Sequence, residues 1–149
     1  MNYANNSKKF AAVLNGKVPI PRLLNALAHT TAGLATSLSR SAVQYLDYEN
    51  ASDGFRSSIA EAPFIILKAK NGNQLATLLG QAKTAGIPHN TFISAMIGSS
   101  AEEQLKQTHN ASGDDLEYWV VVIFGDAEAI NPLTKKFSLF NVNASGHGG

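Results

Sequence analysis

The sequence has no cysteine, no long apolar run and no marked excess of charge of either sign. The lack of cysteine excludes disulfides, thiolate catalysis and zinc sites built on cysteine. No apolar run reaches the roughly 18 residues of a membrane-spanning helix, so we expect no membrane segment. A long apolar stretch is also missing near the N-terminus, so we expect a cytoplasmic protein rather than a secreted one.

Charged residues are few and almost balanced. Twelve lysines and arginines against eleven acidic residues give a net charge of +1 at pH 7. This balance is not typical of a general nucleic-acid binder. The apolar content of 44% is ordinary for a globular protein, and 149 residues are enough for one domain with a single core.

Alternating strand and helix patterns predict one α/β domain over residues 8–140. Runs of apolar and β-branched residues predict strands at 8–15, 63–70, 89–96, 117–125 and 138–140. Helices are predicted between them over 21–39, from an Asn73 cap to Gly86, over 101–107, and after Asp126, with a break at Asn131 before Pro132. This alternation predicts a three-layer α/β/α sandwich with a mixed, mainly parallel sheet of four or five strands. Residues 1–7 and 141–149 are polar and are expected to be disordered.

Residues 40–62 form the least regular part of this pattern. A weak alternation over 43–48 and the turn pair Asp53-Gly54 predict an inserted hairpin or irregular flap. The insertion carries three acidic residues, Asp47, Glu49 and Asp53.

The first predicted helix has two distinct faces. Spacing of three and four residues defines an apolar face that is expected to pack on the sheet, formed by Ile20, Leu23, Leu24, Leu27, Thr31, Leu34 and Leu38. A second face combines polar groups with very small residues, which leaves room for another molecule, and it is formed by Arg22, Ala26, His29, Gly33 and Thr36.

His29 and Arg22 are the candidate catalytic residues. An imidazole can act as a general acid or base near neutral pH, and the alternative for His29 is a half-buried histidine bonded to a backbone carbonyl. Arg22 lies seven residues earlier at almost the same azimuth, where it could pair with an anionic ligand near the helix N-terminus. The alternative for Arg22 is a solvated arginine of the first turn.

No metal or cofactor site is predicted. The four histidines show no helical pairing with one another or with a carboxylate on a predicted helix. The pair Gly16-Lys17 lacks the rest of a phosphate-binding loop, and no nucleophile elbow occurs.

Several segments, taken in order, resemble a known fold family. They are KFAAVLN, PRLLNALAHTTAGL, PFIILKAKNGNQLATLLGQAKTAGIP, FISAMIGSSAEEQLKQT and YWVVVIFGDAEAINPLTKKFSLF. Over roughly residues 8–140 the chain resembles peptidyl-tRNA hydrolase II and, more closely, the related domain-of-unknown-function family 2000. The resemblance implies the peptidyl-tRNA hydrolase II-like fold.

The residues of the hydrolase pattern are only partly present. That pattern places a lysine, a glutamine and a histidine along the first helix and an aspartate after the third strand. The corresponding positions here read Arg22, Ala26, His29 and Ser94. An arginine keeps the charge but cannot shuttle a proton at neutral pH, and the amide and the acid are gone. Asn25, one position from the missing glutamine, and Ser94 are the remaining ligand-binding candidates.

Three functions stay open from the sequence. The first is an uncharacterised protein that binds a small polar or anionic ligand between the first helix and the 40–62 insertion. The second is a divergent hydrolase acting on peptidyl-tRNA or another ester. The third is a non-catalytic interaction module, a homodimer whose small-residue face packs on a second copy. The basic residues are scattered, which makes tRNA a doubtful partner.

Overall fold

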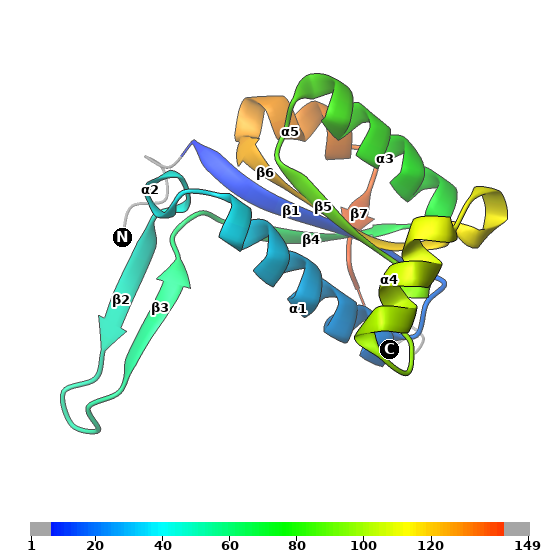
Figure 1. Cartoon of the computed structure of the whole chain (residues 1–149). Helices are drawn as coiled ribbons and strands as arrows, with labels where there is room; N and C mark the ends of the chain where they lie inside the picture. The colour runs from blue at the N-terminus through cyan, green and yellow to red at the C-terminus, as the bar shows by residue number, and fades with distance from the viewer. Residues whose placement is uncertain (1–6, 142–149) are drawn as a thin grey trace, which may run out of the picture.

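The computed structural model describes residues 7–141 and shows an α/β domain with helices on both faces of one sheet (Figure 1). Helix α1 (Ile20–Ser37) covers one face, and helices α3 (Gly72–Ala85) and α5 (Ala127–Thr134) cover the other. The sheet has five strands in the order β5-β6-β1-β4-β7, so it falls within the predicted size. Its strands are β1 (Lys8–Asn15), β4 (Phe64–Ala69), β5 (His89–Ile93), β6 (Tyr118–Asp126) and β7 (Ser138–Leu139).

The sheet is mixed, but the prediction that it is mainly parallel is wrong. Only β1 and β4 pair in parallel, whereas β6 is antiparallel to both β1 and β5, and β7 is antiparallel to β4. Strands β1, β4 and β5 run in one direction, as helical crossovers require. However, β6 inserts between β1 and β5 in the opposite direction. Its unbroken apolar run reflects burial on both faces, which suits a central strand of either direction.

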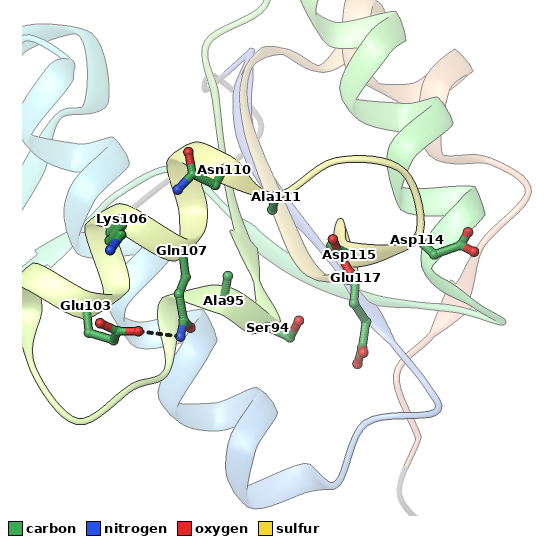
Figure 2. Close-up of a pocket in the computed structure, with 10 residues that line it drawn as sticks. All are labelled: Ser94, Ala95, Glu103, Lys106, Gln107, Asn110, Ala111, Asp114, Asp115 and Glu117. Atoms are coloured by element: carbon green, nitrogen blue, oxygen red, sulfur yellow. Dashed lines mark hydrogen bonds between the residues drawn. The ribbon is translucent and has the colours of Figure 1, made fainter.

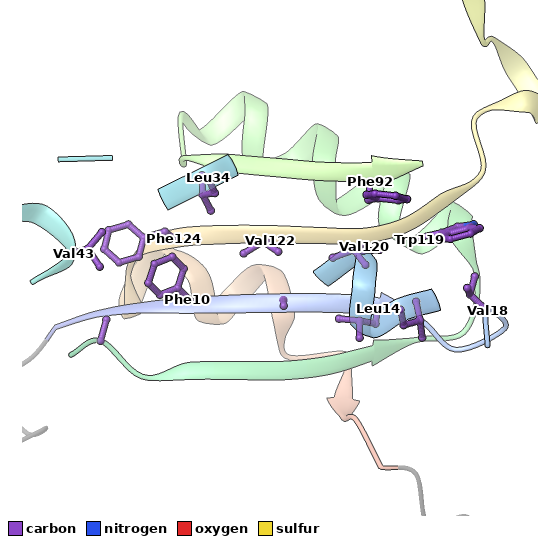
Figure 3. Packing of buried hydrophobic residues seen from close by; sticks show 14 residues of the cluster. Phe10, Leu14, Val18, Leu34, Val43, Phe92, Trp119, Val120, Val122 and Phe124 are labelled. Carbon is purple, nitrogen blue, oxygen red and sulfur yellow. The ribbon is translucent and has the colours of Figure 1, made fainter. Parts of the chain in front are cut away.

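The core consists of two layers of side chains that meet the sheet from opposite sides. Every residue from Trp119 to Phe124 in β6 is buried. Because side chains alternate along a strand, Val120 and Val122 point to the α1 layer, and Val121 and Ile123 point to the α3–α5 layer. Figure 3 shows the α1 layer, in which the rings of Phe10 and Phe124 lie 4.6 Å apart.

Helix α1 is rotated relative to the face predicted from its sequence. Its buried residues are Leu23, Ala26, Thr30 and Leu34. Leu24, expected on the sheet, is 61% exposed, and Ala26, expected on the second face, is fully buried. The cause is the position of the helix, which lies mainly over β5 and β6 and leaves β4 largely uncovered.

Residues 40–62 form a short helix and a projecting hairpin. Helix α2 (Arg40–Val43) leads into β2 (Tyr45–Glu49) and β3 (Arg56–Ala60), which pair only with each other among the described strands. Gly54 has φ of +89°, a turn conformation that suits glycine. Figure 1 shows this hairpin extending away from the main sheet.

Side chains cap the N-termini of α3 and α4, and two predicted positions along the helices need correction. Helix α3 is capped by Asn71 rather than Asn73, because the Asn71 side chain accepts a hydrogen bond from the Gln74 amide at 3.1 Å. Helix α4 (Ala101–Asn110) begins after the predicted Ser100 cap. The predicted break at Asn131 is wrong, because α5 continues through Pro132, whose missing N–H removes one intrahelical hydrogen bond.

Two glycines near each other in the chain are expected to respond to alanine with opposite sign. Gly86 ends α3 with φ of +70°, so Gly86→Ala is expected to lower the free energy of unfolding by about 1 kcal/mol. Gly80 lies inside α3 with nothing within 4 Å of an added β-carbon, so Gly80→Ala is expected to raise it by up to about 1 kcal/mol. Urea denaturation of both variants measures the difference. Equal changes in the free energy of unfolding would contradict the explanation from backbone conformation.

No helix within residues 7–141 is long and apolar enough to cross a bilayer. The disorder predicted for residues 1–7 and 141–149 concerns residues that lie outside the described range, apart from Ser7 and Asn141. Of these, Ser7 joins the fold, because its carbonyl accepts a hydrogen bond from the Ala127 amide at 2.8 Å.

Candidate functional site

Two cavities of similar size flank helix α4 and the short 3-10 helix η2 (Ser94–Met96). The first, called here the histidine cavity, has a volume of about 540 Å³ and lies between α1, β5 and the N-terminal half of α4. Its lining residues are Asn25, His29, Thr30, Asn90, Thr91, Phe92, Met96, Ile97, Gly98 and Gln104. It therefore brings together the second face of the first helix and a strand some sixty residues later in the chain.

Most polar groups of the histidine cavity already hold its walls together. The Asn90 amide donates to the Thr30 carbonyl at 3.1 Å and so joins β5 to α1. The Thr91 hydroxyl donates to the Val120 carbonyl at 2.8 Å, which fixes β5 against β6. The Gln104 amide donates to the Gly98 carbonyl at 3.1 Å and fastens α4 to the loop before it. These groups shape the cavity rather than offer free bonds to a ligand.

Gly33 makes the close approach of α1 to β5 possible. A β-carbon at this position would lie 2.9 Å from the Asn90 amide nitrogen. The close contact at Gly33 is therefore made with a side chain of the neighbouring strand.

Asn25 and His29 are the polar groups of this cavity that remain available. They lie one turn apart on α1, and both are exposed. Within residues 7–141 neither side chain forms a hydrogen bond. His29 therefore differs from the half-buried, carbonyl-bonded histidine considered as its alternative. That description fits His89 instead, whose Nδ1 lies 2.7 Å from the Ile87 carbonyl oxygen.

The other two predicted site residues lie elsewhere. Arg22 does not line the histidine cavity, and its guanidinium carbon lies 6.0 Å from the centroid of the Trp119 ring. Ser94 lines the second cavity, and its amide donates to the Glu117 carbonyl at 3.0 Å. The structure thus brings Asn25 and His29 together and separates them from Arg22 and Ser94.

The second cavity, called here the acidic cavity, lies on the other side of η2 (Figure 2). It has a volume of about 570 Å³, and acidic side chains from α4 and the following loop predominate over the single Lys106 around it. Its carboxylates are those of Glu103, Asp114, Asp115 and Glu117. The Gln107 amide donates to Glu103 at 2.7 Å. Within residues 7–141 no group of histidine and acidic residues is arranged to hold a metal ion.

The acidic residues of the insertion take no part in either cavity. Asp47 and Glu49 lie on strand β2, and Glu49 forms an ion pair with Arg56 across the hairpin at 3.5 Å. The histidine cavity is closed by α4 rather than by residues 40–62. A site between the first helix and the insertion, as expected from the sequence, is therefore not what surrounds His29.

Sequence reasoning missed the contribution of Asn90, Thr91 and Gln104. Asn90 and Thr91 belong to a predicted strand, where an Asn-Thr pair is typical of an exposed polar surface. No spacing rule connects them to the first helix. The one indirect signal was Gly33, since glycine inside a helix often marks a close approach of another element.

The fold and the histidine cavity define a small α/β domain with a polar surface cavity beside its first helix. Over residues 8–141 the chain matches, and belongs to, the family described as protein of unknown function (DUF2000). A solved structure of a protein of unknown function from Agrobacterium tumefaciens strain C58 is similar, with a TM-score of 0.75 and 17% sequence identity, covering 91% of this chain and 98% of that chain. At this identity the likeness concerns the fold alone. No curated protein matches the sequence.

Proposed function

We propose that the chain binds a small polar molecule in the histidine cavity, with Asn25 and His29 as the groups that recognise it. The observation that carries this proposal is the pair itself. Two polar side chains one turn apart face a cavity of about 540 Å³ and have no hydrogen-bond partner within residues 7–141. Binding sites for small molecules commonly combine an apolar surface with a few convergent polar groups, and Phe92, Met96 and Ile97 supply the apolar part here.

The lining also limits the charge of the ligand. Among residues 7–141, no lysine, arginine, aspartate or glutamate lines the histidine cavity. A highly charged ligand would lose hydration there without gaining a counter-ion. We therefore propose a neutral ligand or one with a single anionic group beside His29, and we keep the cytoplasmic location expected above.

Ester hydrolysis is the second candidate, and the open position of His29 favours it. A reachable imidazole can serve as a general base. Against peptidyl-tRNA as the substrate, Ala26 is fully buried where the hydrolase pattern has an amide, and Ser94 faces the acidic cavity. Binding of tRNA also needs several converging phosphate contacts, and no lysine or arginine in the described part of the chain lines the histidine cavity. The relation to peptidyl-tRNA hydrolase II is thus proposed for the fold and not for the activity.

A thermal-shift panel of nucleosides, amino acids and small carboxylic acids tests ligand binding. At least one class is expected to raise the melting temperature of the wild type, and His29→Ala and Asn25→Ala are each expected to abolish that rise. His109→Ala is the matched control, because His109 is an exposed histidine on α4 outside the cavity lining. A rise of equal size in His29→Ala, or none in the wild type, would contradict the proposal.

The same variants separate binding from hydrolysis. Release of the acyl group from peptidyl-tRNA is expected to match the uncatalysed rate in wild type and in His29→Ala. Turnover that is present in the wild type and lost in His29→Ala would instead favour the hydrolase.

A further inference from the structure

On the α1 side of the sheet, residues 7–141 leave the side chains of β4 partly uncovered. Helix α1 lies mainly over β5 and β6, so the side chains of β4 on this side remain open. Phe64 and Ile66 are each 36% exposed although they belong to a strand in the interior of the strand order. Phe64 stacks on the buried Phe10 ring at 5.2 Å, which places it on the α1 side.

Neighbouring elements extend this open surface. The amide of Phe140, which follows β7, donates to the Ile66 carbonyl at 3.0 Å, and Phe140 packs at the margin of the α1 layer. Ile20 and Leu24 are exposed on the flank of α1 opposite to His29. We call this surface the β4 face, and it consists of Ile20, Leu24, Phe64, Ile66 and Phe140.

The projecting hairpin carries a second unpartnered apolar surface. Cross-strand pairing places Leu46 opposite Ile59 and Tyr48 opposite Ser57, so these residues share one side of the hairpin. Ile59 is 52% exposed, and Tyr48 is also exposed. The other side holds polar pairs such as Glu49 with Arg56. Tyr45 and Ala60 at the base of that other side pack on the α1 layer, whereas Leu46, Tyr48 and Ile59 are not part of it. A two-stranded hairpin with so little burial is marginally stable in water, so its apolar side is expected to pack on something.

The two surfaces are complementary in charge as well as in polarity. Strands β2 and β3 and their turn contain Asp47, Glu49 and Asp53 against the single Arg56. By contrast, Lys68 lies on the same side of β4 as Phe64 and Ile66, and neither α1 nor β4 contains an acidic residue. Opposite charges at the rim orient partners and suppress wrong pairings.

We propose that the β4 face receives the hairpin of a second copy of this chain, in a two-fold dimer in which each hairpin covers the β4 face of the other copy. This exchange buries the β4 face and the apolar side of the hairpin in both copies. Because the arrangement has two-fold symmetry, neither surface is left open to a further copy. The chain's own C-terminal segment, VNASGHGG, begins two residues after Phe140 in the sequence, but its single large apolar residue is a poor match for such a surface. The interface predicted on the small-residue face of α1 is thereby replaced, because that flank faces β5 and the histidine cavity.

Complementation between two variants tests the exchange. Light scattering or sedimentation is expected to give the wild type twice its monomer mass of 15.8 kDa. Ile59→Asp on the hairpin and Ile66→Asp on the β4 face are each expected to be monomeric alone. Their equimolar mixture is expected to contain heterodimers, because one hairpin–face junction in each pair is then fully wild type. Both positions are partly exposed, and circular dichroism checks that the variants fold.

Two control variants distinguish a lost interface from a folding defect caused by an apolar-to-acidic change. Leu105→Asp, at a residue 72% exposed on α4, is expected to stay dimeric. Asp47→Lys changes only an exposed polar position and is expected to raise the dimer dissociation constant about tenfold. The proposal is overturned by a monomeric wild type at micromolar concentration, by a mixture that stays monomeric, or by a dimer that Ile59→Asp does not weaken. It is also overturned if removal of residues 142–149 is what first creates the dimer, since that segment would then be the natural cover.

Discussion

Replacing Leu23 by alanine is expected to lower the free energy of unfolding by about 3 kcal/mol, whereas Leu24→Ala is expected to change it by less than about 0.5 kcal/mol. Leu23 is only 1% exposed and belongs to the α1 layer of the core, so its truncation leaves a cavity. Leu24 is 61% exposed, so its truncation removes few contacts within the chain. Urea denaturation of the two variants measures both values.

This comparison is best made in protein that carries Ile66→Asp, because the proposed dimer would cover Leu24. In that monomeric background only contacts within one chain contribute to the difference. If Leu24→Ala lowered the free energy of unfolding as much as Leu23→Ala, α1 would pack through its predicted apolar face and cover β4.

The same pair of leucines shows how far the sequence determines the fold. Three- and four-residue spacing identifies α1 as an amphipathic helix, and this prediction holds. The spacing does not tell which edge of the apolar stripe meets the sheet, because leucines occupy both edges. That choice depends on Ala26 and Gly33, whose small size lets α1 approach β5 and β6 closely. The helix therefore lies over β5 and β6 rather than over β4, and Leu24 is left exposed.

The order of the strands could not be predicted from the sequence, for a similar reason. The apolar run of β6 predicts a central strand, and every residue from Trp119 to Phe124 is buried as this requires. Burial on both faces is the same whether the neighbours are parallel or antiparallel. The insertion of β6 between β1 and β5 depends on long-range pairing, which no local pattern encodes.

The candidate site was only partly predictable. His29 and Asn25 share one helix, so helical geometry alone places them one turn apart. Asn90 bonds to the carbonyl of Thr30 across a separation of 60 residues, and only the fold brings these two together. Arg22 was assigned from its azimuth on the helix as well as from the resemblance, and Ser94 from the resemblance alone. Both lie outside the histidine cavity.

Trp119→Ala is expected to be the most destabilising of the single substitutions discussed, at about 3 to 5 kcal/mol. Trp119 is buried at the start of β6, and its ring stacks on Phe92 with centroids 5.6 Å apart. Its indole N–H donates to a Glu117 carboxylate oxygen at 2.9 Å. Alanine removes the ring volume and this hydrogen bond together. Trp119→Phe keeps an aromatic ring beside Phe92 and is expected to lose less than half as much, as chemical denaturation would measure.

The contact with the Trp119 ring also indicates that Arg22 has a structural role. An exposed cation above an aromatic ring contributes only about 0.5 to 1 kcal/mol, so Arg22→Ala is expected to cause a small loss of stability. It is also expected to leave the ligand-induced thermal shift of the wild type unchanged, because Arg22 lies against Trp119 and outside the histidine cavity. If Arg22→Ala instead removed that shift while stability was preserved, Arg22 would be part of the binding site. The cavity would then extend along α1 to its first turn, and an anionic ligand would gain the counter-ion that the lining of the histidine cavity lacks.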